Sequence, residues 1–213
     1  MIKEVCVENF THIPIAVEKG AQRIELCDHL SVGGTTVSHD VAAKSLSYCK
    51  ANNVKVMALI RPRGGTFFYT DEEINIMLED IIHFKKLGIH GVVIGCLNRE
   101  AWIDEESMHK LLHVANGMDV TFHMAFNHLS PTRKLEAIDW LASKGIKRIL
   151  THGGPLHTKI EQNISILKEY IAYASDKIII MPGGGITNQN LPMLLESLAI
   201  TEIHGTRILG DLV

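Results

Sequence analysis

Short runs of β-branched and other apolar residues recur along the chain, and each run ends near a glycine, a proline or a polar cluster. Such runs predict strands, and eight of them are found, at residues 2–7, 22–27, 54–60, 91–95, 119–123, 147–151, 177–181 and 201–204. Amphipathic segments lie between them. The segment that begins at Asp71 has apolar residues at positions 74, 77, 78, 81 and 82, which is the stripe of a helix that lies on a sheet. A βα unit therefore repeats through the whole chain.

The repeat predicts an α/β fold, a TIM (β/α)8 barrel that forms a single domain over residues 1–213. A doubly wound open sheet is the alternative, but no glycine-rich dinucleotide fingerprint follows the first strand. Only nine residues follow the last strand, so we expect the eighth helix to be absent or incomplete. Val5, Val7 and Ile203 would then form an exposed apolar strip, and we expect a homodimer or larger homo-oligomer to cover it.

The composition is that of a globular protein, with 46% hydrophobic and 21% charged residues and a formal net charge of −3. This charge leaves no basic surplus for nucleic acid or for an anionic membrane surface. The apolar runs are too short to span a membrane, and the N-terminus lacks the pattern of a signal peptide. We therefore expect a cytoplasmic protein whose four cysteines stay reduced, which favours metal binding or nucleophilic chemistry over disulfides.

Three strands carry polar residues on the side that faces the barrel interior. Strand alternation places six polar side chains there, two from each strand: Glu4, Cys6, Glu25, Cys27, Glu202 and His204. Because these strands are neighbours in a closed barrel, we expect the two thiols and the imidazole to share one layer at the C-terminal mouth, where TIM barrels carry their sites. Cys6, Cys27 and His204 then form a soft metal site for Cu(I) or Zn(II), with Met57 and Met181 as further donors. The alternative, that the cysteines are small core residues, stays open.

Cationic residues and glycine-rich loops indicate a second kind of site at the same mouth. Arg61 and Arg63 directly follow the third strand and would either bind an anion or neutralise the inward glutamates, for which Arg23 and Lys55 are also candidate partners. Four glycines follow the seventh and eighth strands: Gly183, Gly184, Gly185 and Gly205. Loops at this position form the usual phosphate site of the fold, although glycines also serve simply as turns.

Titratable groups near the mouth are the candidates for catalysis. His123 ends the fifth strand on its inward side, where it would act as an acid, a base or a ligand, or as a structural histidine. The candidate acid and base groups are Glu4, Glu25, His123, Glu202 and His204. They suit an enzyme that acts on a small phosphorylated or otherwise anionic substrate.

Seven segments, in this order, resemble the CutC family of copper homeostasis proteins: Glu4-Val-Cys-Val7, Arg23-Ile-Glu-Leu-Cys27, Gly33-Gly34-Thr35, Ile60-Arg-Pro-Arg-Gly-Gly65, Thr121-Phe-His123, Arg148-Ile-Leu-Thr151 and Met181-Pro-Gly-Gly-Gly185. The resemblance implies a cytoplasmic TIM barrel, dimeric or larger, that binds Cu(I), and it places the family's two barrel-mouth cysteines on Cys6 and Cys27. The chain departs from the family at Met124 and Asn127, where the family has an arginine and an aspartate. We therefore expect a copper-binding protein, with the enzyme as the alternative.

Overall fold

Eight parallel strands form one sheet that curves into a nearly closed barrel in the computed structural model of the chain, which describes residues 1–212. The strands are β1 (Ile2–Glu8), β2 (Arg23–Cys27), β3 (Lys55–Leu59), β4 (Gly91–Ile94), β5 (Asp119–Phe122), β6 (Arg148–Thr151), β7 (Ile179–Pro182) and β8 (Glu202–Gly205). Their order is β7-β6-β5-β4-β3-β2-β1-β8, so the last strand pairs with the first. The predicted TIM barrel is confirmed, and each predicted strand is found with its ends shifted by at most two residues.

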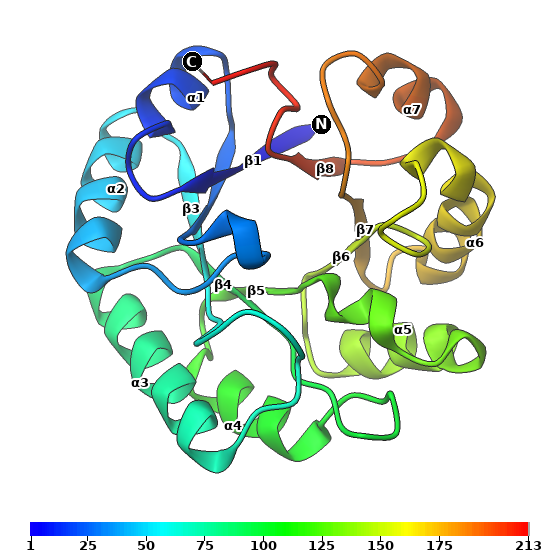
Figure 1. The fold of residues 1–213 in the computed structure, drawn as a ribbon, viewed down its shortest axis with the longest axis horizontal. Helices are drawn as coiled ribbons and strands as arrows, with labels where there is room; N and C mark the ends of the chain where they lie inside the picture. The colour runs from blue at the N-terminus through cyan, green and yellow to red at the C-terminus, as the bar shows by residue number, and fades with distance from the viewer. Residues whose placement is uncertain (213) are drawn as a thin grey trace.

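Helices surround the barrel as a ring (Figure 1). The α-helices are α1 (Ile13–Glu18), α2 (His39–Ala51), α3 (Asp71–Leu87), α4 (Glu105–Val114), α5 (Lys134–Ser143), α6 (Ile164–Ala174) and α7 (Leu191–Ser197). Short 3-10 helices are η1 (Leu30–Val32), η2 (Met124–His128), η3 (Pro131–Arg133) and η4 (Ile160–Asn163). None of the helices within residues 1–212 is long and apolar enough to cross a membrane.

Helix α3 shows how local sequence sets these elements. Thr70 and Glu73 form a reciprocal capping box at its start, which satisfies two free N–H groups. The helix ends at Gly88, whose φ of 91° is accessible to glycine at little cost. Ile74 and other residues of the predicted stripe are buried against the barrel. Ile82, predicted in that stripe, is instead 39% exposed.

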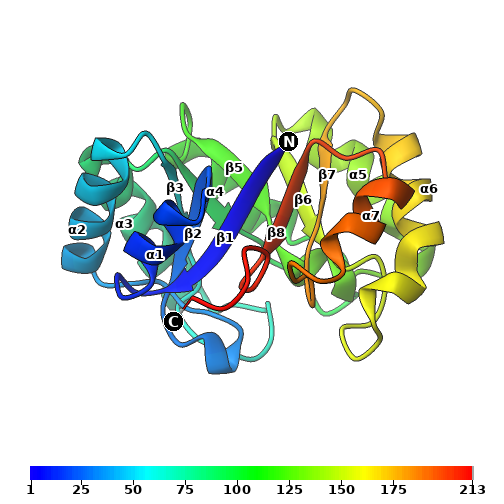
Figure 2. The same cartoon turned by 90° about the horizontal axis from the view of Figure 1, so that it is seen from above.

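The apolar strip expected beside β8 is not exposed, and that prediction is wrong. Val5 and Ile203 have no solvent-accessible surface, although residues 206–212 form no helix. The C-terminal segment instead passes beside α1 (Figures 1 and 2), where Lys19 Nζ donates to the Asp211 carbonyl oxygen at 2.6 Å. Ile208 on this segment is buried in the same apolar cluster as the strip. This surface therefore gives no reason to expect an oligomer.

The barrel interior is divided between two kinds of side chain. Five of them form a small apolar cluster of their own: Cys6, Cys27, Met57, Leu59 and Val93. The remaining interior holds a network of buried charged groups, described next. Most of the buried apolar side chains form one cluster, which holds the outer core between sheet and helices.

Candidate functional site

A chain of buried ion pairs crosses the interior of the barrel. Arg23, on β2, donates to the carboxylates of Glu4 on β1 and Glu202 on β8. Arg148, on β6, lies 2.9 Å from Glu202 and 3.3 Å from Asp119. Both arginines are almost fully buried. Two inward glutamates therefore have their charge partners within the barrel, as buried carboxylates require.

Only one of the predicted partners of the glutamates is correct. Arg23 is confirmed, whereas Lys55, Arg61 and Arg63 are not partners of any inward glutamate in the described residues. The partner that sequence reasoning missed is Arg148. Its signal was a cation at the start of a strand, directly before two apolar residues.

His204 joins this network at the mouth. Its Nδ1 lies 2.8 Å from Glu4 Oε1 and 4.0 Å from Glu25 Oε2. Burial opposes the charge of the imidazole, but the carboxylates of Glu25 and Glu4 outweigh it and raise the pKa of His204. Burial raises the pKa of Glu25, whereas His204 and Arg23 overcome burial at Glu4 and lower its pKa to about 2. Glu25 and His204 are therefore neighbouring titratable groups, and the pKa of each is raised by its surroundings.

The ion pairs of Glu4 predict a specific loss of stability in acid. Glu4 ionises near pH 2 in the fold but near 4.5 when free, so its contribution is present above pH 4.5 and is lost as the pH falls toward 2. The lost contribution is roughly 3 kcal/mol. We expect Glu4→Gln to unfold more easily at neutral pH and to lose less stability than the natural chain over this acid range. Melting temperatures measured across the range check this, and equal losses in both proteins would contradict it.

The two thiols lie side by side, as predicted. Cys6 Sγ is 3.7 Å from Cys27 Sγ, and both side chains are buried inside the barrel. Cys6 also donates to Glu25 Oε1 at 3.5 Å, and Cys27 donates to the Val7 carbonyl oxygen at 3.4 Å. Met57 packs in the same cluster. Met181 does not, because its sulfur lies 3.2 Å from the Arg23 guanidinium.

His204 does not share one layer with both thiols, so the prediction of a shared layer is wrong, whereas the ligand set of Cys6, Cys27 and His204 stays a prediction. The register places Cys6 opposite Glu25 and Cys27 opposite Glu8, further toward the mouth, whereas His204 stands opposite Glu4. The structure brings together Cys6, Glu25 and His204 instead, with one ligand atom of each within 4.8 Å of the other two.

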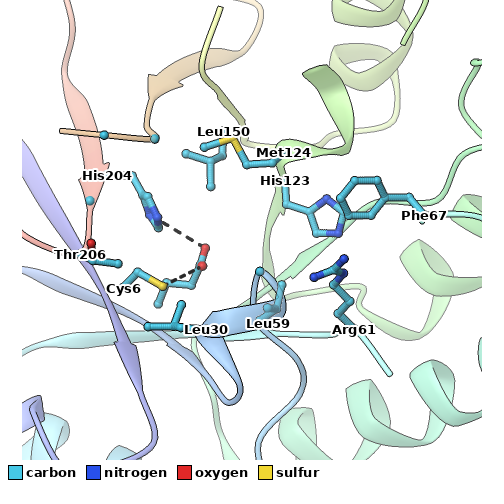
Figure 3. Close-up of a pocket in the computed structure, with 15 residues that line it drawn as sticks. Cys6, Leu30, Leu59, Arg61, Phe67, His123, Met124, Leu150, His204 and Thr206 are labelled. Atoms are coloured by element: carbon cyan, nitrogen blue, oxygen red, sulfur yellow. Dashed lines mark hydrogen bonds and ion pairs between the residues drawn. The ribbon is translucent and has the colours of Figure 1, made fainter. Parts of the chain in front are cut away.

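A pocket of about 280 Å³ opens above these groups, and Figure 3 shows how the labelled side chains line it. Of the five candidate acid and base groups, it is lined by Glu25, His123 and His204. Glu4 and Glu202 do not line it, because the arginines engage them deeper in the barrel. A ligand in the pocket would therefore meet a thiol, a carboxylate and two imidazoles.

The two arginines after β3 have different surroundings. Arg61 lines the pocket and is buried, and its guanidinium donates to three backbone carbonyl groups. Arg63 points elsewhere and forms a two-point ion pair with Glu73 at the start of α3. Arg63 therefore belongs to the helix start, and the predicted anion role is open only to Arg61.

The glycine loops border the same pocket. Gly184, Gly185 and Gly205 line it, and Gly184 and Gly185 have φ values of 87° and 76°, which L-residues rarely adopt. Gly183 donates its N–H to the Thr151 carbonyl oxygen, so this donor is already used. The geometry fits turns that shape the mouth, and an anion site between these two loops stays a prediction.

The two residues that depart from the family pattern touch each other. Asn127 Nδ2 lies 3.1 Å from Met124 Sδ, and Asn127 Oδ1 accepts from Thr151 Oγ1 and from the His152 N–H. Met124 lines the pocket, whereas Asn127 does not. Asparagine in place of the family's aspartate therefore removes a negative charge near the pocket, but position 127 does not line the pocket itself.

The fold and the mouth define a TIM barrel with two neighbouring thiols, one of which lies beside a carboxylate and an imidazole. The CutC family model matches residues 1–209, and the chain belongs to the CutC family. The family protein CutC of Enterococcus faecalis is 54% identical over 98% of this chain and 100% of its own length. The human copper homeostasis protein cutC homolog is 38% identical over 95% of this chain and 72% of its own length.

Solved structures agree with this assignment. The crystal structure of CutC from Streptococcus agalactiae superposes with a TM-score of 0.95 at 38% identity, and it covers 98% of this chain and 99% of that one. A deoxyribose phosphate aldolase from Aeropyrum pernix superposes with a TM-score of 0.69 at 12% identity, over 99% of this chain and 87% of that one. This second likeness shows the barrel fold alone.

Proposed function

We propose that this protein serves copper homeostasis by binding Cu(I) at the barrel mouth through Cys6 and Cys27. The observation that carries the proposal is the pair of buried thiols 3.7 Å apart on adjacent strands. Thiolate sulfur is the soft donor that Cu(I) prefers over carboxylate or water. The family, whose human member is named as a copper homeostasis protein, supports the same metal.

The spacing of the sulfurs indicates a third ligand. With metal–sulfur bonds of about 2.3 Å, a separation of 3.7 Å between the sulfurs corresponds to an angle of about 110° at the metal. A bent arrangement leaves room for another donor on the open side. Glu25 and His204 each have a ligand atom within 4.8 Å of Cys6 Sγ. We assign the third ligand to one of these two groups.

Cys6 holds its proton before the metal arrives. The hydrogen bond with Cys27, burial and the Glu25 carboxylate together raise the pKa of Cys6 well above its usual value. A metal must therefore displace a thiol proton when it binds. Copper affinity is expected to rise with pH for this reason.

Cu(I) binding under reducing conditions tests the site. In competition with a Cu(I) chelator, we expect the natural chain to bind one equivalent and the Cys6→Ser, Cys27→Ser double variant to bind none. The matched control is Cys49→Ser with Cys96→Ser, since these buried cysteines lie outside the group at the mouth, and it should bind one equivalent. Repeating the titration at higher pH checks the proton release. Unchanged binding in the first double variant would overturn the proposal.

We place this function in the cytoplasm, where reduced thiols are stable, and we propose that the protein acts as a homodimer or larger homo-oligomer, as the family resemblance implies. The proposed domain is the whole of residues 1–213. Light scattering at micromolar concentration checks the oligomer, because a monomer under these conditions would exclude it.

A further inference from the structure

Arg61 is a buried cation without a carboxylate partner. Its side chain is 5% exposed, and no Asp or Glu oxygen lies within ion-pair distance among residues 1–212. The guanidinium donates to the carbonyl oxygens of Val32, Gly34 and Gly65 at 2.8–3.0 Å. These dipoles hold the group in place, but they do not neutralise it. Its Nε–H, also buried, has no acceptor in the same part of the chain.

His123 presents a second unused donor. Its Nδ1 accepts the N–H of Ala125 at 3.2 Å, so the ring proton resides on Nε2. Nε2 is buried and has no hydrogen-bond partner in the described residues. Burial and the neighbouring charge of Arg61 lower the pKa of His123 to about 3, so the ring is neutral near neutral pH. It therefore offers an N–H group without adding charge.

The two residues that carry these unused donors line the same side of the pocket. Figure 3 shows Arg61 and His123 beside the Phe67 ring, across the pocket from Cys6 and His204. The Phe67 ring centroid is 4.8 Å from that of His123 and 5.0 Å from Arg61 Cζ. A buried polar group without a partner costs stability unless a ligand satisfies it. Two such donors, on residues that line one side of the pocket, indicate a place for a ligand oxygen.

We propose that Arg61 and His123 form a binding site for the carboxylate of a small hydroxycarboxylate. The site has one net positive charge and two N–H donors, which match a monoanionic carboxylate with two oxygens. A phosphate group carries nearly twice that charge, so up to about half of its charge would stay uncompensated. The cavity of about 280 Å³ limits the ligand to a small molecule.

Glu25, another residue that lines the pocket, offers an acceptor for the hydroxyl group of such a ligand. Glu25 Oε2 is buried, has no hydrogen-bond partner in the described residues and belongs to a residue that lines the pocket. A hydroxyl group of the ligand would donate to this oxygen while its carboxylate contacts Arg61 and His123. This site adjoins the thiol pair, because the other carboxylate oxygen of Glu25 accepts from Cys6 Sγ at 3.5 Å. It gives the alternative enzyme activity its substrate class.

Binding to the reduced, metal-free protein tests this site without reference to copper. We expect glycerate to raise the melting temperature in a saturable way at constant ionic strength. Propionate, which lacks the hydroxyls, should bind at least tenfold more weakly, and inorganic phosphate should give no saturable shift. An equal response to all three, or a stronger response to phosphate, would overturn the proposal.

A conservative variant links this binding to the two donors. In His123→Asn, the amide oxygen can still accept the Ala125 N–H, but the Nε2–H is lost. We expect the variant to bind glycerate at least tenfold more weakly than the natural chain, whereas His113→Asn, on the exposed face of α4, should bind as the natural chain does. Equal glycerate affinity in His123→Asn would overturn the proposal, and if this variant does not fold, Arg61→Lys takes its place with the same expected loss.

Discussion

Arg23→Met is expected to destabilise the barrel by about 3–5 kcal/mol, the usual cost of removing one partner from a buried ion pair. Arg23 is 2% exposed and pairs with both Glu4 and Glu202. Methionine fills much of the same volume, so the loss arises from uncompensated carboxylates and not from a cavity. For a chain of this size the melting temperature should fall by roughly 6–20 °C. Thermal unfolding measured at neutral pH checks this.

Two further variants separate the charge effect from a general effect of substitution. Arg99 is exposed, and Arg99→Met should change stability by less than about 0.5 kcal/mol. Glu4→Gln combined with Arg23→Met should be less destabilised than the sum of the single changes, because the first change removes a carboxylate that the second leaves unpaired. Additive effects, or a melting temperature of Arg23→Met equal to that of the natural chain, would show that the ion pairs of Arg23 contribute little to stability.

The strand pattern predicted the barrel because its period of two separates the outward apolar face from the interior. It placed Cys6, Cys27 and Glu25 inside correctly. The pattern indicates which face a residue occupies but not its height along the barrel, which depends on the stagger between strands. His204 is therefore inside as predicted but contacts Glu4 and not both thiols.

Other errors came from contacts that are distant in sequence. Arg148 reaches Glu202 across β7, which lies between β6 and β8 in the chain, and no local pattern contains that pairing. The C-terminal segment buries Ile208 without helical periodicity, so its covering role was not visible in the sequence. The proposed carboxylate site shows the same limit, since Arg61 and His123 come from loops after different strands. The position of each residue after its strand predicted that Arg61 and His123 lie at the mouth, but only the fold shows that they lie beside each other.

Gly91→Ala is expected to destabilise the protein by about 3 kcal/mol, because the barrel has no space for a methyl group there. Gly91 begins β4 opposite Met57 in the register. An added Cβ would overlap the carbonyl oxygen of Asp119 and would lie 2.6 Å from Met57 Sδ. The side chain of Met57 can move, but the Asp119 oxygen belongs to the backbone of β5. We expect the melting temperature to fall by roughly 6–12 °C.

A second substitution identifies which contact is responsible for this loss. Gly91→Ala with Met57→Ala removes the sulfur but leaves the backbone oxygen, so we expect no recovery of the melting temperature. Gly20→Ala is the control, since a Cβ there meets nothing within 4 Å and only the φ of 89° opposes it; it should cost about 1 kcal/mol. A full recovery in the double variant would assign the cost to Met57, and an unchanged melting temperature in Gly91→Ala would show that β4 and β5 can separate to admit a methyl group.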